Sequence, residues 1–97
     1  MAVSRAERRA DRTDRVIAIF GDALATTVLD LLELTELAWH DCYREITPTE
    51  EIVNDILLCS DGDLAKLIRV CRKAVEDWRD IKMAAQDRRT AGSSSTP

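Results

Sequence analysis

Histidine and cysteine are the side chains whose spacing most directly indicates metal binding or nucleophilic catalysis, and this chain has few of them. It contains one histidine, His40, and three cysteines, Cys42, Cys59 and Cys71, with no Cys-x-x-Cys pair. A structural zinc site needs four such ligands at short spacings, and a nucleophilic cysteine needs a base beside it. A helix that carries His40 and Cys42 points them to opposite sides. The sequence therefore predicts neither a metal site nor a catalytic cysteine.

Carboxylates offer one further arrangement, in which Glu33, Glu36 and His40 follow one another on a predicted helix. Carboxylate-bridged diiron bundles use a Glu-x-x-His spacing, which is absent here because Glu36 and His40 are four residues apart. The sequence also lacks a glycine-rich phosphate loop. We therefore expect no catalytic residue, no cofactor and no metal, and a protein that is not an enzyme.

The composition is typical of a small helical protein. Of 97 residues, 45% are hydrophobic and 33% are charged, with only three glycines and two prolines. This is too apolar for a disordered chain, and it favours helices over strands. Apolar runs are far shorter than the roughly 20 residues that cross a bilayer, and no secretory signal is visible. We expect a cytoplasmic protein, and the Ala-, Arg-, Asp- and Leu-rich composition suggests a GC-rich bacterium or its phage.

The most apolar stretch of the chain predicts a long helix over about residues 22–46. Gly21 before it indicates a kink or short break from a charged N-terminal helix, which begins after the capping-box pair Ser4 and Glu7. The apolar stripe of residues 1–15 is weak, so we expect that helix to be frayed. The helical wheel of the central helix places on its core side Leu24, Val28, Leu31, Leu32, Ala38, Trp39, Cys42, Tyr43 and Ile46.

A third helix is predicted by the segment ITPTEE. In this segment Thr47 matches an N-cap, Pro48 a first helical residue and Glu50 the acid of a capping box. The helix is expected to end near Cys59, where the segment SDGD breaks it.

The final predicted helix covers about residues 63–89, with Ser60 or Asp61 as its N-cap. At 1.5 Å per residue, its roughly 27 residues would span about 40 Å, whereas a compact domain of this size is only about 30 Å across. The part beyond Trp78 is therefore expected to project or to pair with a second subunit, and residues 90–97 to form a disordered tail. An uninterrupted heptad series runs along this helix: Leu64, Leu67, Cys71, Ala74, Trp78, Ile81 and Ala85.

Together these elements predict an all-α fold, a small antiparallel bundle of three to four helices in a single domain over residues 1–89. The two long helices, at about 22–46 and 63–89, are expected to pack antiparallel, with the short third helix closing one end.

Charge is segregated along the chain. Residues 1–20 carry five arginines against three acids, residues 21–63 carry eleven acids against one arginine, and residues 64–97 carry eight Lys and Arg against four acids. Packing acidic beside basic segments absorbs this segregation without a ligand. We expect the acidic edge of the central helix to lie beside the basic flank of the final helix.

The preferred functional interpretation is a small protein-interaction module, an adaptor or regulator that acts as a homodimer. Two leucines interrupt the acidic outer side of the central helix, and the distal part of the final helix is left for a second subunit. Trp78 fits the core as well as an interface. The candidate partner-binding residues are Leu34, Leu37, Trp78, Ile81 and Ala85.

The alternative is a nucleic-acid-binding transcriptional regulator, because residues 48–75 can form a helix-turn-helix around Gly62. Against it, Asp61 and Asp63 lie where phosphates must approach, and neighbouring acids partly neutralise the cations of the final helix. The predicted partners are thus a protein first, nucleic acid as a disfavoured second, and no membrane. The residues that would bind nucleic acid are Arg69, Arg72, Lys73, Arg79 and Lys82.

Overall fold

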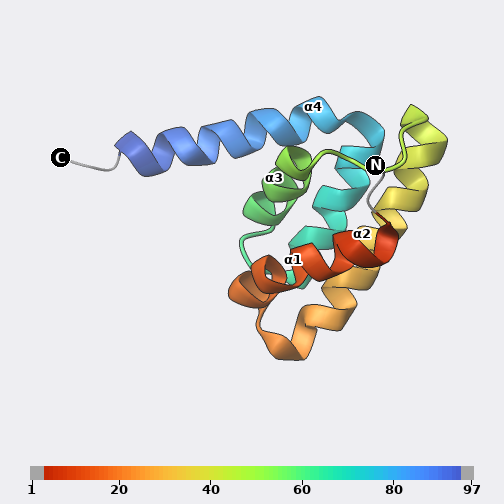
Figure 1. The fold of residues 1–97 in the computed structure, drawn as a ribbon. Helices are drawn as coiled ribbons and strands as arrows, with labels where there is room; N and C mark the ends of the chain where they lie inside the picture. Colours follow the sequence, from red (N-terminus) through yellow and green to blue (C-terminus); the bar gives the residue numbers. More distant parts are fainter. Residues whose placement is uncertain (1–3, 95–97) are drawn as a thin grey trace.

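The computed structural model describes residues 4–94, which form four helices and no strand (Figure 1). The predicted all-α bundle is confirmed. Within the described range, no helix is both long enough and apolar enough to cross a membrane. The helices are α1 (Arg5–Phe20), α2 (Asp22–Tyr43), α3 (Glu50–Ser60) and α4 (Leu64–Ser94).

The predicted signals at both ends of α1 are confirmed. The Ser4 hydroxyl accepts a hydrogen bond from the Glu7 N–H, and the Glu7 carboxylate accepts one from the Ser4 N–H. Gly21 separates α1 from α2 with a φ of +83°, in the region that favours glycine. From this turn α1 folds back along α2, and Arg9 in its middle pairs with Glu33 of α2.

The helix α2 and the first half of α4 lie side by side and run in the same direction (Figure 1). Thr35 of α2 and Cys71 of α4 are both buried beside one groove, and further along both helices the Tyr43 hydroxyl binds the carbonyls of Ala74 and Val75. This differs from the expected antiparallel pairing of the two long helices. The reason is topological, because α3 lies between them in the chain and two successive reversals restore the original direction.

The connection from α2 to α3 differs from the expected one. Arg44, in a left-handed conformation with a φ of +58°, ends α2, so Ile46 lies outside the helix and is 69% exposed. Cys42, also expected in the core, is exposed. The N-cap of α3 is Thr49, whose hydroxyl accepts from the Ile52 N–H. Thr47, which the local pattern assigned to this cap, has partners elsewhere in the fold.

The bounds of α4 also differ from the prediction. Asp61 ends α3 in a left-handed conformation, and it is Asp63 whose carboxylate binds the N–H of Ala65 in the first turn of α4. The helix continues to Ser94 instead of ending near residue 89. The end of the expected tail, residues 95–97, lies outside the described residues.

A sharp bend at Asp77 divides α4. The backbone of Asp77 is extended there, with φ −160° and ψ 100°. Residues 78–94, which we call the distal segment, turn away from α2 and cross α3 before their tip projects from the body (Figure 1). The long dimension of the molecule is 45 Å. The helix is therefore not straight, contrary to expectation, and the part of it beyond Asp77 packs on α3 up to the projecting tip.

The hydroxyl of Tyr43 fills the gap that the bend leaves in the hydrogen-bond ladder of α4. In a regular helix the Trp78 N–H would bind the Ala74 carbonyl. Here the hydroxyl lies 2.8 Å from the Ala74 carbonyl and accepts from the Trp78 N–H at 3.3 Å. A side chain inserted in this way is a recognised cause of a sharp helix bend.

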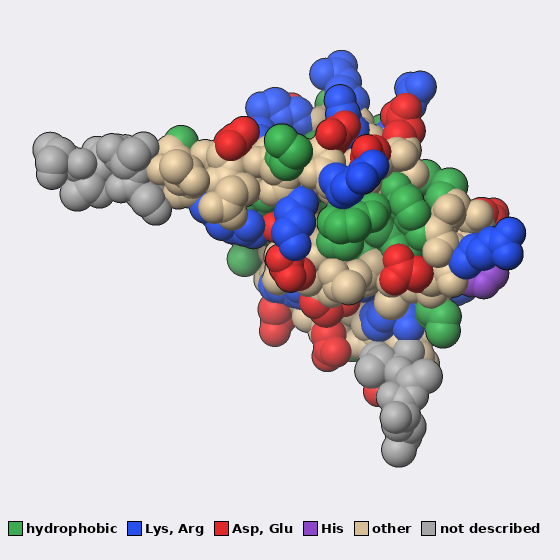
Figure 2. All heavy atoms as spheres, turned by 90° about the horizontal axis from the view of Figure 1, so that it is seen from above, with side chains coloured by type: hydrophobic (Ala, Val, Ile, Leu, Met, Phe, Trp, Pro, Cys, Tyr) green, Lys and Arg blue, Asp and Glu red, His purple; other side chains and the backbone are tan. Residues whose placement is uncertain are grey.

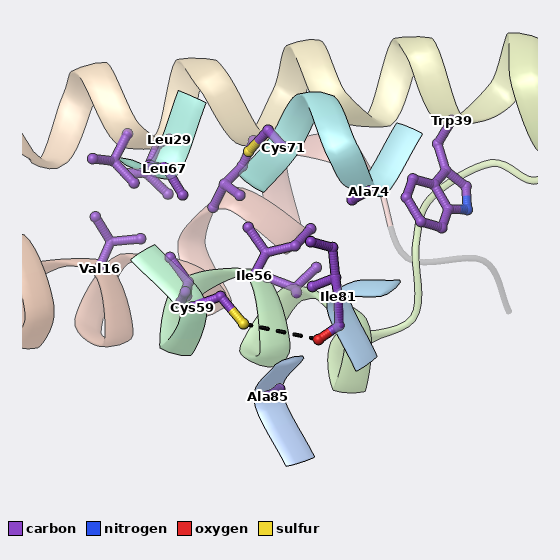
Figure 3. Packing of buried hydrophobic residues seen from close by; sticks show 14 of the residues in the cluster. Val16, Leu29, Trp39, Ile56, Cys59, Leu67, Cys71, Ala74, Ile81 and Ala85 are labelled. Atoms are coloured by element: carbon purple, nitrogen blue, oxygen red, sulfur yellow. Dashed lines mark hydrogen bonds between the residues drawn. The ribbon is translucent and has the colours of Figure 1, made fainter. Parts of the chain in front are cut away.

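All four helices contribute to a single core (Figure 3). The heptad residues of α4 are buried on both sides of the bend, Leu67 and Ala74 before it and Ile81 and Ala85 after it. The Cys59 thiol of α3 lies 3.8 Å from the Ile81 carbonyl and donates to it. The stripe thus packs on α2 before the bend and on α3 after it.

A buried charged network connects the N-terminal half of the chain. Arg12 of α1 and Glu36 of α2 are each 2% exposed, and their charged atoms lie 3.3 Å apart. The Thr47 hydroxyl donates to the same Glu36 oxygen at 2.6 Å, and Arg12 also pairs with Glu50 of α3 at 2.7 Å. Arg8 is a further partner of Glu36. The segment that was expected to be frayed is therefore anchored to the body.

Replacing Glu36 by Gln should destabilise the fold strongly. The change leaves the buried Arg12 guanidinium without one of its two carboxylates, and breaking a buried pair typically costs about 3 kcal/mol or more. Glu33→Gln is the matched control, since Glu33 pairs with the same helix at the surface, where a pair is worth less than about 1 kcal/mol. Urea unfolding of both variants measures the difference. Equal losses would contradict the assigned role of the network.

The network also holds its carboxyl groups in the charged form. Burial alone raises the pKa of Glu36, but hydrogen bonds from Thr47 and Arg8 and the nearby charge of Arg12 outweigh it and lower the pKa below the ordinary value of 4.5. The pKa of Glu50 is lowered in the same way, again against the effect of burial, by the α1 arginines. Both groups therefore release their protons more readily in the folded chain than in the unfolded chain.

This difference predicts a loss of stability in acid. A lowered carboxyl pKa contributes stability that is fully present above the unfolded value and is lost as the pH falls through the folded value. The free energy of unfolding should therefore decrease between about pH 5 and pH 2. Urea midpoints at a series of pH values test this, and Glu33→Gln should keep the dependence because it leaves Glu36 and Glu50 in place. An unchanged midpoint between neutral and acid pH would refute it.

Candidate protein-binding site

A shallow apolar groove of about 380 Å³ lies between α2 and the first half of α4. One exposed aliphatic side chain lines each wall: Leu34 on α2 is 62% exposed and Ile68 on α4 is 52% exposed. We call this the α2–α4 groove. Its apolar lining consists of Leu31, Leu34 and Ala38 from α2 and Ile68, Cys71 and Val75 from α4.

The parallel packing of α2 and α4 creates this groove. Thr35 and Cys71 are buried where the two helices touch, and the groove lies above that contact line. Leu34 and Ile68 lie beside this contact line, on opposite walls of the groove, and both face solvent. Neither side chain is part of the buried contact between α2 and α4.

The structure separates the two leucines that the sequence grouped together. Leu34 lines the groove, whereas Leu37 is 49% exposed outside it. The residue that shares a surface with Leu34 is Ile68, which is not among the predicted partner-binding residues. The sequence contains one indication of this position, since Ile68 and Val75 lie beside the heptad series and not in it.

The other three predicted partner-binding residues lie on the distal segment. Ile81 and Ala85 are 4% and 0% exposed, because the bend at Asp77 directs them onto the body of their own chain. Trp78 is half-buried and lines a small hollow with Ile52 of α3. In this conformation Ile81 and Ala85 belong to the core and form no surface for another molecule.

The five cations proposed for nucleic-acid binding do not form an isolated basic surface. Three of them have an acidic partner in the same chain, as Arg72 with Glu76, Arg79 with Asp77 and Lys82 with Glu51. The other two, Arg69 and Lys73, line a crevice at the bend of α4 together with Asp80 and Asp87. Figure 2 accordingly shows Lys and Arg side chains interspersed with Asp and Glu on the face that it presents.

Residues 48–75, for which a helix-turn-helix was the alternative prediction, contain α3, a short turn and the first part of α4. Its turn carries a strongly acidic group, since hydrogen bonds from Arg88 and Lys66 lower the pKa of Asp61 to about 2. The Asp61 carboxylate is therefore ionised at any ordinary pH, with Lys66 and Arg88 as its counter-ions.

Acidic and basic segments of the chain pair with each other, but the pairs differ from the expected ones. The acids of α2 and α3 face the arginines of α1, where Arg9 binds Asp30 at 2.9 Å and Arg15 binds Glu50 at 2.6 Å. The distal segment supplies further cations to α3, including Arg89, which binds Asp55. The basic flank of α4 does not line the acidic edge of α2.

The groove is lined mainly by apolar side chains, and its polar members are Thr35, Arg72 and Glu76. Burial raises the pKa of the Cys71 thiol at its base, which keeps this cysteine protonated and unreactive. Across residues 4–94, no group of three or more His, Cys, Asp or Glu side chains is placed to hold a metal ion.

Comparison with family models, with curated proteins and with solved structures finds no match to this chain.

Proposed function

We propose that this chain is a non-enzymatic protein-interaction module, an adaptor or regulator, whose α2–α4 groove receives a helix of a protein partner. The observation that supports this most directly is the exposure of Leu34 and Ile68 on facing walls of one groove. Large aliphatic side chains that converge in this way mark binding surfaces more often than isolated exposed leucines do.

The spacing of the lining residues favours a helix as the occupant. The three α2 residues, Leu31, Leu34 and Ala38, and the three α4 residues, Ile68, Cys71 and Val75, follow the same spacing of three and then four. Two parallel rows with this spacing form ridges with a groove between them, into which the side chains of a third helix pack. Each row extends over about 10 Å, or two helical turns. A partner helix with an apolar stripe of two turns matches this length.

The charges near the groove are largely paired within the chain. Asp30, on the outer edge of α2, binds Arg9, and Arg72 on α4 lies 3.8 Å from Glu76. We therefore expect apolar contact to supply most of the affinity, with only a weak dependence on salt. Nucleic-acid binding, the alternative, predicts a steep dependence on salt. It stays a prediction that no specific feature of the fold favours.

Substitution of the groove residues tests the proposed function. Leu34→Asp and Ile68→Asp each place a charge in the groove, whereas Ile46→Asp places one at an equally exposed site on the α2–α3 connection. All three variants should keep the wild-type stability to within about 0.5 kcal/mol. A protein retained from source-cell extract, after nuclease treatment, by wild type and by Ile46→Asp should be lost by both groove variants.

Calorimetry with the purified partner should then show a loss of affinity of about tenfold or more for each groove variant, the effect of removing one central apolar contact. Affinity should change little with salt concentration. Identical sets of retained proteins for wild type and the groove variants would refute the proposal, and retention that requires nucleic acid would favour the alternative.

A further inference from the structure

The bend of α4 occurs where the sequence contains no helix-breaking residue. Neither glycine nor proline lies between Gly62 and Gly92, and the heptad series continues through the bend without a change of phase. The inserted hydroxyl of Tyr43, from another helix, accounts for the bend instead. The sequence of α4 is therefore equally compatible with a straight helix.

Straightening α4 replaces the hydrogen bonds of the Tyr43 hydroxyl by bonds within the helix backbone. In the bent form the Tyr43 hydroxyl binds both the Ala74 carbonyl and the Trp78 N–H, and in a straight helix these two backbone groups bind each other. The Asp77 carboxylate caps the distal segment by accepting from the Arg79 N–H at 3.1 Å. These few local contacts hold the bend.

A straightened distal segment needs a new surface to cover it. On its own α3 it buries Ile81 and Ala85, and its Arg89 is the counter-ion of Asp55, whose side chain is 1% exposed. A straight monomer would expose the two apolar residues to water and leave the Asp55 charge unpaired, and both changes cost free energy. A surface that satisfies all of these groups at once is α3 of a second copy of this chain.

We propose that the distal segment exchanges between two copies of this chain. In the exchanged dimer α4 is straight at Asp77, and each distal segment occupies on the other copy's α3 the position that it has here on its own. The contacts beyond the hinge are all retained between chains, which makes such exchange a low-cost route to a closed two-fold dimer. Leu34 and Ile68 precede the hinge, so this self-association does not use the α2–α4 groove.

A crosslink between α3 and the distal segment distinguishes the two forms. The carboxylate of Glu51 and the ammonium of Lys82 lie 3.2 Å apart, and both side chains are exposed. Glu51→Cys and Lys82→Cys are introduced together with Cys42→Ser, which removes the exposed native thiol. After ¹⁵N-labelled and unlabelled chains are refolded together, a short bis-maleimide joins positions 51 and 82. Peptides of mixed isotope come only from exchanged dimers, whereas peptides of one isotope come from closed monomers and from exchanged dimers of two like-labelled chains.

We expect the mixed-isotope fraction to increase with protein concentration. Two hinge variants, Asp77→Ala and Tyr43→Phe, should each increase it by roughly an order of magnitude, since each removes from both hinges a hydrogen bond that only the bent form makes. Leu34→Asp should leave it unchanged, which separates this dimer from any association through the groove. Links of a single isotope at every concentration, in wild type and in whichever hinge variants fold, would overturn the proposal.

Discussion

The fold depends most on the buried ion pair between Arg12 and Glu36. Both side chains are removed from water, so each charge requires partners in the folded chain that compensate for its lost hydration. Those partners come from three further places, namely Arg8 of α1, Thr47 of the α2–α3 connection and Glu50 of α3. One network thereby fixes the relative positions of three helices. Apolar packing alone would tolerate a shift of α1 along α2, whereas this network specifies one position.

A second long-range contact determines the shape of the C-terminal half. The Tyr43 hydroxyl takes the place of a backbone hydrogen bond in α4, and the chain turns at Asp77 onto α3. Because the bend preserves the phase of the heptad series, one apolar stripe packs first on α2 and then on α3. The same stripe in a straight helix would leave Ile81 and Ala85 beyond the edge of the body.

Local sequence signals predicted local structure well, and long-range contacts account for what they missed. The Ser4 capping box and the break at Gly21 depend on residues close in sequence, and both are confirmed. Thr47 matches an N-cap pattern, but its hydroxyl binds Glu36, eleven residues earlier. The bend at Asp77 arises from a hydroxyl more than thirty residues away in the sequence. No periodicity in α4 reveals a contact of this kind.

The candidate site shows the same limit of prediction from local sequence. Leu34 was identified because it interrupts a polar face, whereas Ile68 becomes exposed only through the parallel direction of α2 and α4, which depends on the whole topology. The groove includes Val75, whose carbonyl accepts from the Tyr43 hydroxyl at 2.9 Å. Groove and hinge therefore use the same α2–α4 contact. Under both proposals, a helix bound in the groove shifts the balance between the closed and exchanged forms only to the extent that the α2–α4 contact around Tyr43 differs between them.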